Sequence, residues 1–270
     1  MALPRRRDRP AREAPSGTRG SWSLVALGIV ALLVFVVVTI PASLFGGRLE
    51  RKGVTAMAFT GSIWSGTAVG LAWRGAVLGD LRWRVAPLEL FRGRLGAHVT
   101  LTRPDGRIES NVAATLAGNL HLAGTRVDLP VEALGVLPVG LPKGWRGQLH
   151  ADFTELELAK GWPAVVRGTI DMDGLVAPPP RNASIGSYHA VLPDPKSPTS
   201  PGAGISARVT DKEGPFAVDG RLTLSPDRSF LLEGTLAPRG DTPPALRRSL
   251  ELLGPADSEG RRQFGVSGTI

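Results

Sequence analysis

The sequence predicts a mainly β fold, in which a single N-terminal transmembrane helix is followed by a curved, mostly antiparallel β-sheet domain with one or two short helices. Three observations support this prediction. The chain contains 34 glycines and 23 prolines, which interrupt helices and favour turns. Its central part repeatedly alternates apolar with polar residues, as half-exposed strands do. One uninterrupted apolar run lies near its start.

The apolar run covers residues 24–40 and contains no charged residue. With its flanks it forms the segment 22–45, which as a helix would be roughly 36 Å long and exceed the roughly 30 Å core of a bilayer. The alternative is a cleaved signal peptide. Such peptides have a shorter apolar core of about 7–15 residues and a small-x-small cleavage site, which we do not find here. We therefore expect an uncleaved transmembrane anchor at 22–45.

The charges around this anchor predict its orientation. Residues 1–21 carry six arginines and two acidic residues, whereas three basic residues, Arg48, Arg51 and Lys52, follow the anchor. Because the more basic flank stays in the cytoplasm, we expect a disordered cytoplasmic tail at 1–21 and a β-rich domain on the far side of the membrane at 46–270. The chain is expected to cross the membrane once. Half of the net charge of +8 lies in this tail, directly before the anchor, where membrane proteins keep their topology charges, so nucleic acid is not an expected partner.

Several strands of the domain can be placed by their pattern. Residues 81–85 alternate apolar with basic side chains. Residues 96–102 and 107–116 flank a turn that contains Pro-Asp-Gly, and this predicts a hairpin because proline fixes φ and glycine accepts a positive φ. Residues 119–129 continue the series of strands.

Helices and long loops are few. Residues 131–137 are compatible with a short helical turn. Residues 242–253 predict an amphipathic helix that begins at a threonine and ends before Gly-Pro. The proline-rich segment 193–204 predicts a flexible loop.

A short pattern recurs in the second half of the domain, where a glycine is followed after one residue by leucine or isoleucine. Glycine inside a strand often marks a bulge or bend. The pattern has two interpretations. One is a strongly curved sheet whose hollow side holds an apolar ligand. The simpler one is a set of ordinary antiparallel strands in a glycine-rich protein. These glycines are Gly147, Gly168, Gly220, Gly234 and Gly268.

The sequence contains no motif of an enzyme or of a metal site. It has no cysteine, which excludes disulfides and thiolate ligands. Glu155 with Glu157, and Asp171 with Asp173, share a strand face because they are two residues apart, and a solvated face explains them. We expect no catalytic residue, no metal and no cofactor. Four histidines lie far apart in separate strand-like runs, without the short spacing of metal ligands: His98, His121, His150 and His189.

Two stretches carry a family resemblance. The first reads Thr-Gly-Ser-Ile-Trp-Ser-Gly at 60–66 and precedes Leu-Arg-Trp at 81–83. The second reads Leu-Pro-Val-Gly-Leu-Pro at 137–142, ahead of a strand around Leu149. In this order they resemble protein N of the type II secretion pathway, whose members carry a Gly-Thr-x-Trp-x-Gly box, a Leu-x-Trp strand and a Leu-Pro-x-x-Leu-Pro turn. Ser62 departs from this pattern, because the family often has threonine there.

The resemblance implies a structural role for the signature residues. Glycine permits a tight corner between strands, and Trp64 would plug the end of the sheet. Arg82 and Arg84 alternate with apolar residues, so they face solvent or a partner. The expected signature residues are Gly61, Trp64, Gly66, Trp83, Leu137, Pro138, Leu141 and Pro142.

The resemblance also implies a function. It indicates a non-catalytic, inner-membrane accessory subunit of the type II secretion machinery, which contacts other subunits through its periplasmic domain. Related β folds occur in AsmA-like envelope proteins, which are linked to lipid transport or outer-membrane assembly. The alternative function is therefore a lipid-handling module with an apolar groove. A continuous apolar face over the strands between residues 116 and 236 would favour that alternative.

Overall fold

The computed structural model describes residues 39–269 with several gaps, at 46, 48–49, 52, 88, 90–93, 116, 137–143, 160, 197–203, 241 and 252. The predicted cytoplasmic tail and most of the predicted anchor lie outside the described residues. The chain divides into two units, Met1–Ile40 and Pro41–Ile270. Over the part that is described, no helix combines the length and the apolar content required to cross a bilayer.

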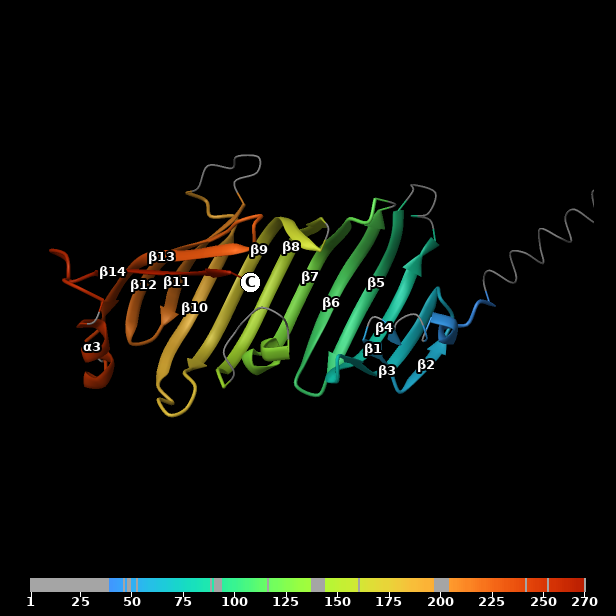
Figure 1. The fold of residues 1–270 in the computed structure, drawn as a ribbon, viewed down its shortest axis with the longest axis horizontal. Coiled ribbons are helices and arrows are strands. Elements are labelled where there is room, and N and C mark those ends of the chain that lie inside the picture. The colour runs from blue at the N-terminus through green and yellow to red at the C-terminus, as the bar shows by residue number, and fades with distance from the viewer. Residues whose placement is uncertain are drawn as a thin grey trace, which may run out of the picture. The chain divides into compact units, whose positions relative to one another are not determined.

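The second unit is built on one 14-stranded antiparallel sheet (Figure 1). Its strands follow one another in chain order, except that the short β1 and β2 both pair with β3. The prediction of a mainly β, antiparallel fold with few helices is confirmed. The strands are β1 (Val54–Thr55), β2 (Ala58–Gly61), β3 (Ser65–Trp73), β4 (Ala76–Ala86), β5 (Arg94–Arg103), β6 (Gly106–Thr115), β7 (Leu120–Pro130), β8 (Arg146–Ala159), β9 (Trp162–Val176), β10 (Ser184–Leu192), β11 (Ile205–Glu213), β12 (Phe216–Leu224), β13 (Ser229–Pro238) and β14 (Arg262–Thr269).

The described helical segments are short, and two of them match the predictions. The 3-10 helix η1 covers Ala42–Phe45, and the 3-10 helix η3 covers Val131–Val136. The helix α3 covers Pro244–Glu251, inside the predicted range. The hydroxyl of Thr242 donates to the carbonyl of Pro215, which ties the start of α3 to the turn between β11 and β12.

The sheet has one polar and one apolar face, because direct cross-strand neighbours share a face and side chains alternate along each strand. One apolar row runs across the strands from β4 to β11 and continues to Phe264 on β14 past the paired glycines Gly220 and Gly234. Most of these side chains remain partly exposed. The row consists of Leu81, Leu101, Ile108, Val127, Ala151, Ile170, Ala190 and Val209.

The core of the sheet lies on this apolar face and is thin. One buried cluster forms around Val131, Leu149 and Leu175, where η3 packs against β8 and β9. A second cluster forms around Leu192 and Ile205 on β10 and β11. Between these clusters no second layer of sheet or helix covers the apolar face in the described residues.

Glycines bend the sheet and allow its strands to approach closely. Figure 1 shows that the axes of β13 and β14 lie across those of β6 to β9, so the sheet is strongly twisted. At Gly124 the ladder between β6 and β7 shifts register, which marks a bulge. Gly168 has φ +157°, and a Cβ there would lie 2.2 Å from the carbonyl oxygen of Asp152 on β8.

Gly168→Ala is therefore expected to lower the free energy of unfolding by about 2 kcal/mol, since the backbone of β8 or β9 must move. Denaturant unfolding measures this loss. Gly265→Ala is the matched control, because a Cβ at Gly265 in β14 meets no atom within 4 Å. A change within about 0.5 kcal/mol is expected for the control. Equal losses for both variants would contradict the role of close strand approach.

Candidate interaction surface

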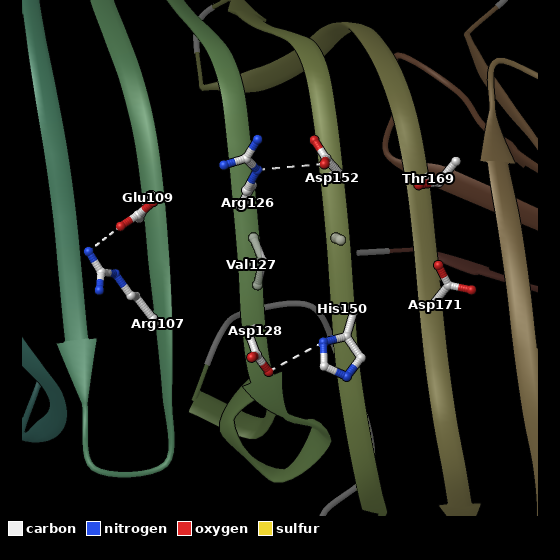
Figure 2. Close-up of a pocket in the computed structure, with 10 residues that line it drawn as sticks. Arg107, Glu109, Arg126, Val127, Asp128, His150, Asp152, Thr169 and Asp171 are labelled. Carbon is white, nitrogen blue, oxygen red and sulfur yellow. Dashed lines mark ion pairs between the residues drawn. The ribbon is translucent and has the colours of Figure 1, made fainter.

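The polar face carries charged side chains in two rows that run across the strands (Figure 2). In each row the residues stand directly opposite one another on neighbouring strands. A shallow hollow of about 450 Å³ lies along both rows. The first row is Arg107, Asp128, His150, Asp171 and His189, and the second is Glu109, Arg126, Asp152 and Thr169.

Acidic side chains contact arginine or histidine side chains within and between these rows. His189 Nδ1 lies 2.8 Å from Asp171 Oδ1, and His150 Nδ1 lies 3.4 Å from Asp128 Oδ1. Figure 2 shows the latter contact and the neighbouring ion pair of Arg126 with Asp152. Each carboxylate of the two rows therefore has an arginine or histidine side chain beside it.

The carboxylates that were noted in the sequence lie on this same face. Glu155 pairs with Arg167 at 3.0 Å, and Glu157 lies 3.4 Å from His121. Lys212 on β11 contacts both Asp171 and Asp173. Burial opposes the ionisation of Asp171, but the hydrogen bonds from His189 and Lys212 outweigh it and lower the pKa of this carboxyl.

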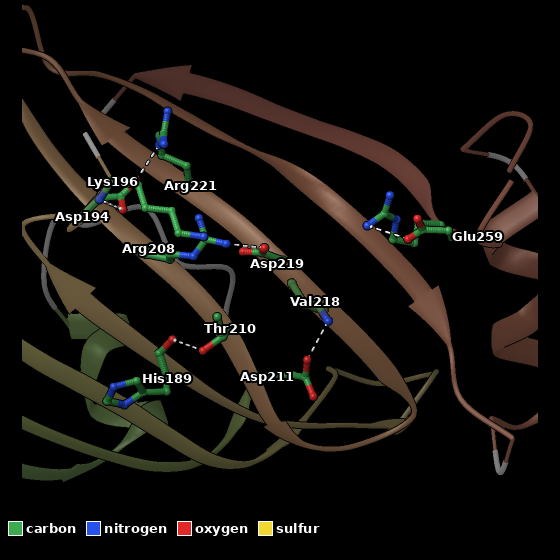
Figure 3. Close-up of polar contacts among 11 residues, drawn as sticks. His189, Asp194, Lys196, Arg208, Thr210, Asp211, Val218, Asp219, Arg221 and Glu259 are labelled. Carbon is green, nitrogen blue, oxygen red and sulfur yellow. Dashed lines mark hydrogen bonds and ion pairs between the residues drawn. The ribbon is translucent and has the colours of Figure 1, made fainter. Parts of the chain in front are cut away.

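An ion pair between a buried carboxylate and a partly exposed arginine lies at the end of the polar face near β10 and β12 (Figure 3). The side chain of Asp194 is fully buried, and it accepts hydrogen bonds from Arg221 Nε at 2.6 Å and from the Lys196 amide at 2.9 Å. Burial opposes its ionisation, yet these two hydrogen bonds and the charges of Arg221 and Arg208 hold the pKa of Asp194 below its ordinary value. Asp194 is thus a structural anion that fixes the chain after β10.

The polar face is an open surface of paired polar side chains. Its acids and histidines are spread along open strands, and those of the two rows each contact a neighbouring side chain. No group of three or more His, Asp or Glu side chains able to hold a metal ion occurs in the described part of the chain. The hollow is an open surface depression, whereas ligand sites are enclosed and mostly apolar.

Arg82 and Arg84 differ from three other arginines of this face, Arg107, Arg126 and Arg167. Both are exposed on β4, and neither has an ion-pair or hydrogen-bond partner among the described residues. By contrast, Arg107, Arg126 and Arg167 each pair with a carboxylate. Together with Ser65, Thr67, His98 and Thr100, the two arginines line a hollow of about 240 Å³. They form an uncompensated basic patch at the N-terminal end of the polar face.

A tight corner between β2 and β3 lies beside this patch. Gly61 has φ +86° and stands opposite Gly66. A Cβ at Gly66 would lie 2.4 Å from the ring of Trp83, because that ring packs across Gly66 from β4. Trp83 Nε1 also donates to the carbonyl of Ile63 at 3.1 Å. The carbonyl of Trp64 accepts from the Val85 amide at 2.7 Å, so the corner is tied to β4 twice.

Comparisons with known proteins decide the family. The family model described as "Type II secretion system (T2SS), protein N" matches residues 52–265. The chain belongs to this protein N family. It is 29% identical to the type II secretion system protein N of Aeromonas hydrophila over 258 residues, which cover 92% of this chain and 98% of the relative. It is 24% identical to the protein N of Vibrio cholerae over 245 residues, covering 88% and 94%. No solved structure matches the chain.

Only part of the expected family signature can be placed in the structure. Gly61, Trp64, Gly66 and Trp83 meet at the corner described above, although their role in the protein N family stays a prediction. The second part of the signature, Leu137, Pro138, Leu141 and Pro142, lies outside the described residues.

The alignment of acids and histidines in the first row of the polar face is a feature of this protein N chain that sequence reasoning missed. The sequence predicts surface or hydrogen-bonded strand histidines without metal-ligand spacing. The structure adds that all four lie on one face, three of them beside a carboxylate. His98 instead contacts Asn111 at 3.0 Å. Which of these side chains stand opposite one another depends on the cross-strand register, for which the sequence carries no local signal.

Proposed function

We propose that this protein N chain is an accessory subunit of the type II secretion machinery, held in the inner membrane by the anchor at 22–45. In this proposal the sheet lies in the periplasm, has no catalytic role and contacts other subunits of the machinery through the basic patch of Arg82 and Arg84. The observation that carries the proposal is that these two arginines lack the acidic partners that other arginines of the face have. An acidic surface on another subunit would supply the missing partners.

A second candidate function rests on the apolar face. The apolar row runs without interruption from β4 to β11 and is partly exposed. Solvent-exposed apolar surface of this extent is a common mark of protein or lipid binding. In this alternative the face holds acyl chains of membrane lipid, as a lipid-handling envelope protein would.

One experiment separates the two functions. A photoreactive residue is placed at position 82, 84 or 122 of the full chain in the native envelope, since Leu122 is on β7 and faces the apolar side. Crosslinked products are identified by mass spectrometry. We expect crosslinks from 82 and 84 to other secretion subunits, and far fewer from position 248, an exposed arginine of α3.

Phospholipid crosslinks from 122, without subunit crosslinks from 82 and 84, would move the assignment to lipid handling. The charge reversals Arg82→Glu and Arg84→Glu give an independent check. Together they are expected to reduce copurification of the subunits at least several-fold, whereas Arg248→Glu leaves copurification unchanged. Copurification that persists after removal of residues 46–270 would contradict the role of the sheet.

A further inference from the structure

The two edges of the sheet are built differently. At the N-terminal edge β1 has two residues and β2 has four, so little continuous backbone is open for pairing. At the other edge β14 has eight residues and pairs with β13 in one unshifted ladder from Arg262 to Thr269. Among the described residues no strand pairs with the outer side of β14.

The outer edge of β14 lacks the usual protection of an edge strand. Natural sheets guard their edges with proline, charged side chains or bulges. The only charged residue of β14 is Arg262 at its start, and the strand has no proline. Gly265, Val266 and Ser267 are exposed, and Val266 is 52% exposed. Alternate amide and carbonyl groups of β14 therefore point outward without a partner in the sheet.

We propose that β14 pairs with β14 of a second copy of this chain, antiparallel and centred on Gly265. In this register Phe264 stands opposite Val266 of the second copy, and the same pair recurs on the other side of the two-fold axis. Even-numbered residues of one copy stand opposite even-numbered residues of the other, and odd opposite odd. The apolar face of one sheet therefore continues into the apolar face of the other, and the polar faces do the same. The two β14 strands then lie at the centre of one continuous sheet formed by both copies.

The side chains of β14 favour a second copy as the occupant. Aromatic and β-branched residues are favourable cross-strand neighbours, and the symmetric register forms this pair twice. Gly265 has no side chain and Ser267 has a small uncharged one, so nothing bulky stands near the axis. Arg262 stands opposite Gly268 of the second copy, so the two Arg262 residues lie roughly 20 Å apart and do not repel strongly. Two-fold isologous pairing is also the commonest form of self-association.

The register predicts a specific crosslink. The chain has no cysteine, so an introduced cysteine is the only thiol that the crosslinker can join in it. A Cβ at Gly265 meets no atom within 4 Å, and its φ is not positive, so Gly265→Cys leaves the fold intact. In the full chain in membranes, a short bismaleimide is expected to convert Gly265→Cys mainly to a covalent dimer. Gly240→Cys is the matched control, because a Cβ there also meets no atom within 4 Å.

A second variant tests the pairing without a crosslinker. Val266→Lys adds a charge to the open edge, and it costs the monomer little because Val266 is half exposed. Light scattering of the detergent-purified chain is expected to show a dimer, and Val266→Lys is expected to raise the dimer dissociation constant at least tenfold. Val77→Lys is the control, since Val77 is 65% exposed on β4.

Two results would overturn the proposal. One is a Gly265→Cys crosslink no stronger than that of Gly240→Cys. The other is a product in which Gly265→Cys is joined to a different protein rather than to a second copy. Neither result bears on the basic patch, so the failure of this proposal is separable from the failure of the proposed function.

Discussion

Replacement of Arg221 by methionine is expected to lower the free energy of unfolding by about 3 kcal/mol, because it leaves the carboxylate of Asp194 buried without its main cation. The side chain of Asp194 is fully buried and lies 2.6 Å from Arg221 Nε. For a domain of this size the loss corresponds to a fall of roughly 6–12 °C in Tm. Calorimetry at neutral pH measures it. Arg248→Met, at an exposed site on α3, is expected to change Tm by less than about 2 °C.

The dependence of this loss on pH identifies its cause. The pKa of Asp194 is lowered in the folded state, so its charge contributes stability above the unfolded pKa of about 4, and this contribution disappears as pH falls through the lower folded pKa. The deficit of Arg221→Met should therefore shrink in acid. The deficit should also shrink in an Asp194→Asn background, where no buried carboxylate is left without its cation. An undiminished deficit in that background would show that Arg221 acts through packing alone.

Local features of the fold could be predicted from the sequence. The Pro-Asp-Gly turn and its flanking alternation gave the hairpin of β5 and β6 within two residues at each end. The helix expected at 242–253 is present as α3, because leucine spacing and the Gly-Pro stop are encoded nearby in the chain. The exposure of Arg82 and Arg84 followed from the same two-residue alternation.

Features that depend on register could not be predicted in this way. In the first row of the polar face, His150 stands opposite both Asp128 and Asp171, and this arrangement depends on the pairing of three strands. The bulge at Gly124 shifts one ladder by a residue and so decides which side chains share a face. The partner of Asp194 was also hidden, because Arg221 lies 27 residues further along the chain.

Trp83→Ala is expected to have the second large effect, a loss of about 3 kcal/mol, because it removes the ring that covers Gly66 and leaves a cavity at the corner of β2 and β3. Trp83→Phe keeps most of the ring but cannot donate to the carbonyl of Ile63, so a smaller loss of about 1 kcal/mol is expected. Arg84→Ala, one residue away on the exposed face, should stay within about 0.5 kcal/mol. Denaturant unfolding of the three variants gives the series.

The same series tests whether the corner supports the basic patch. Arg82 and Arg84 flank Trp83 on β4, so the anchoring of Trp83 to Ile63 sets the path of the strand that presents both arginines. If this is correct, Trp83→Phe should weaken subunit crosslinking from positions 82 and 84 less than Trp83→Ala does, in the order of their losses in stability. If Trp83→Ala unfolds the corner but leaves that crosslinking at its full level, the partner contacts do not depend on the corner, and its glycines and tryptophan serve the stability of the sheet alone.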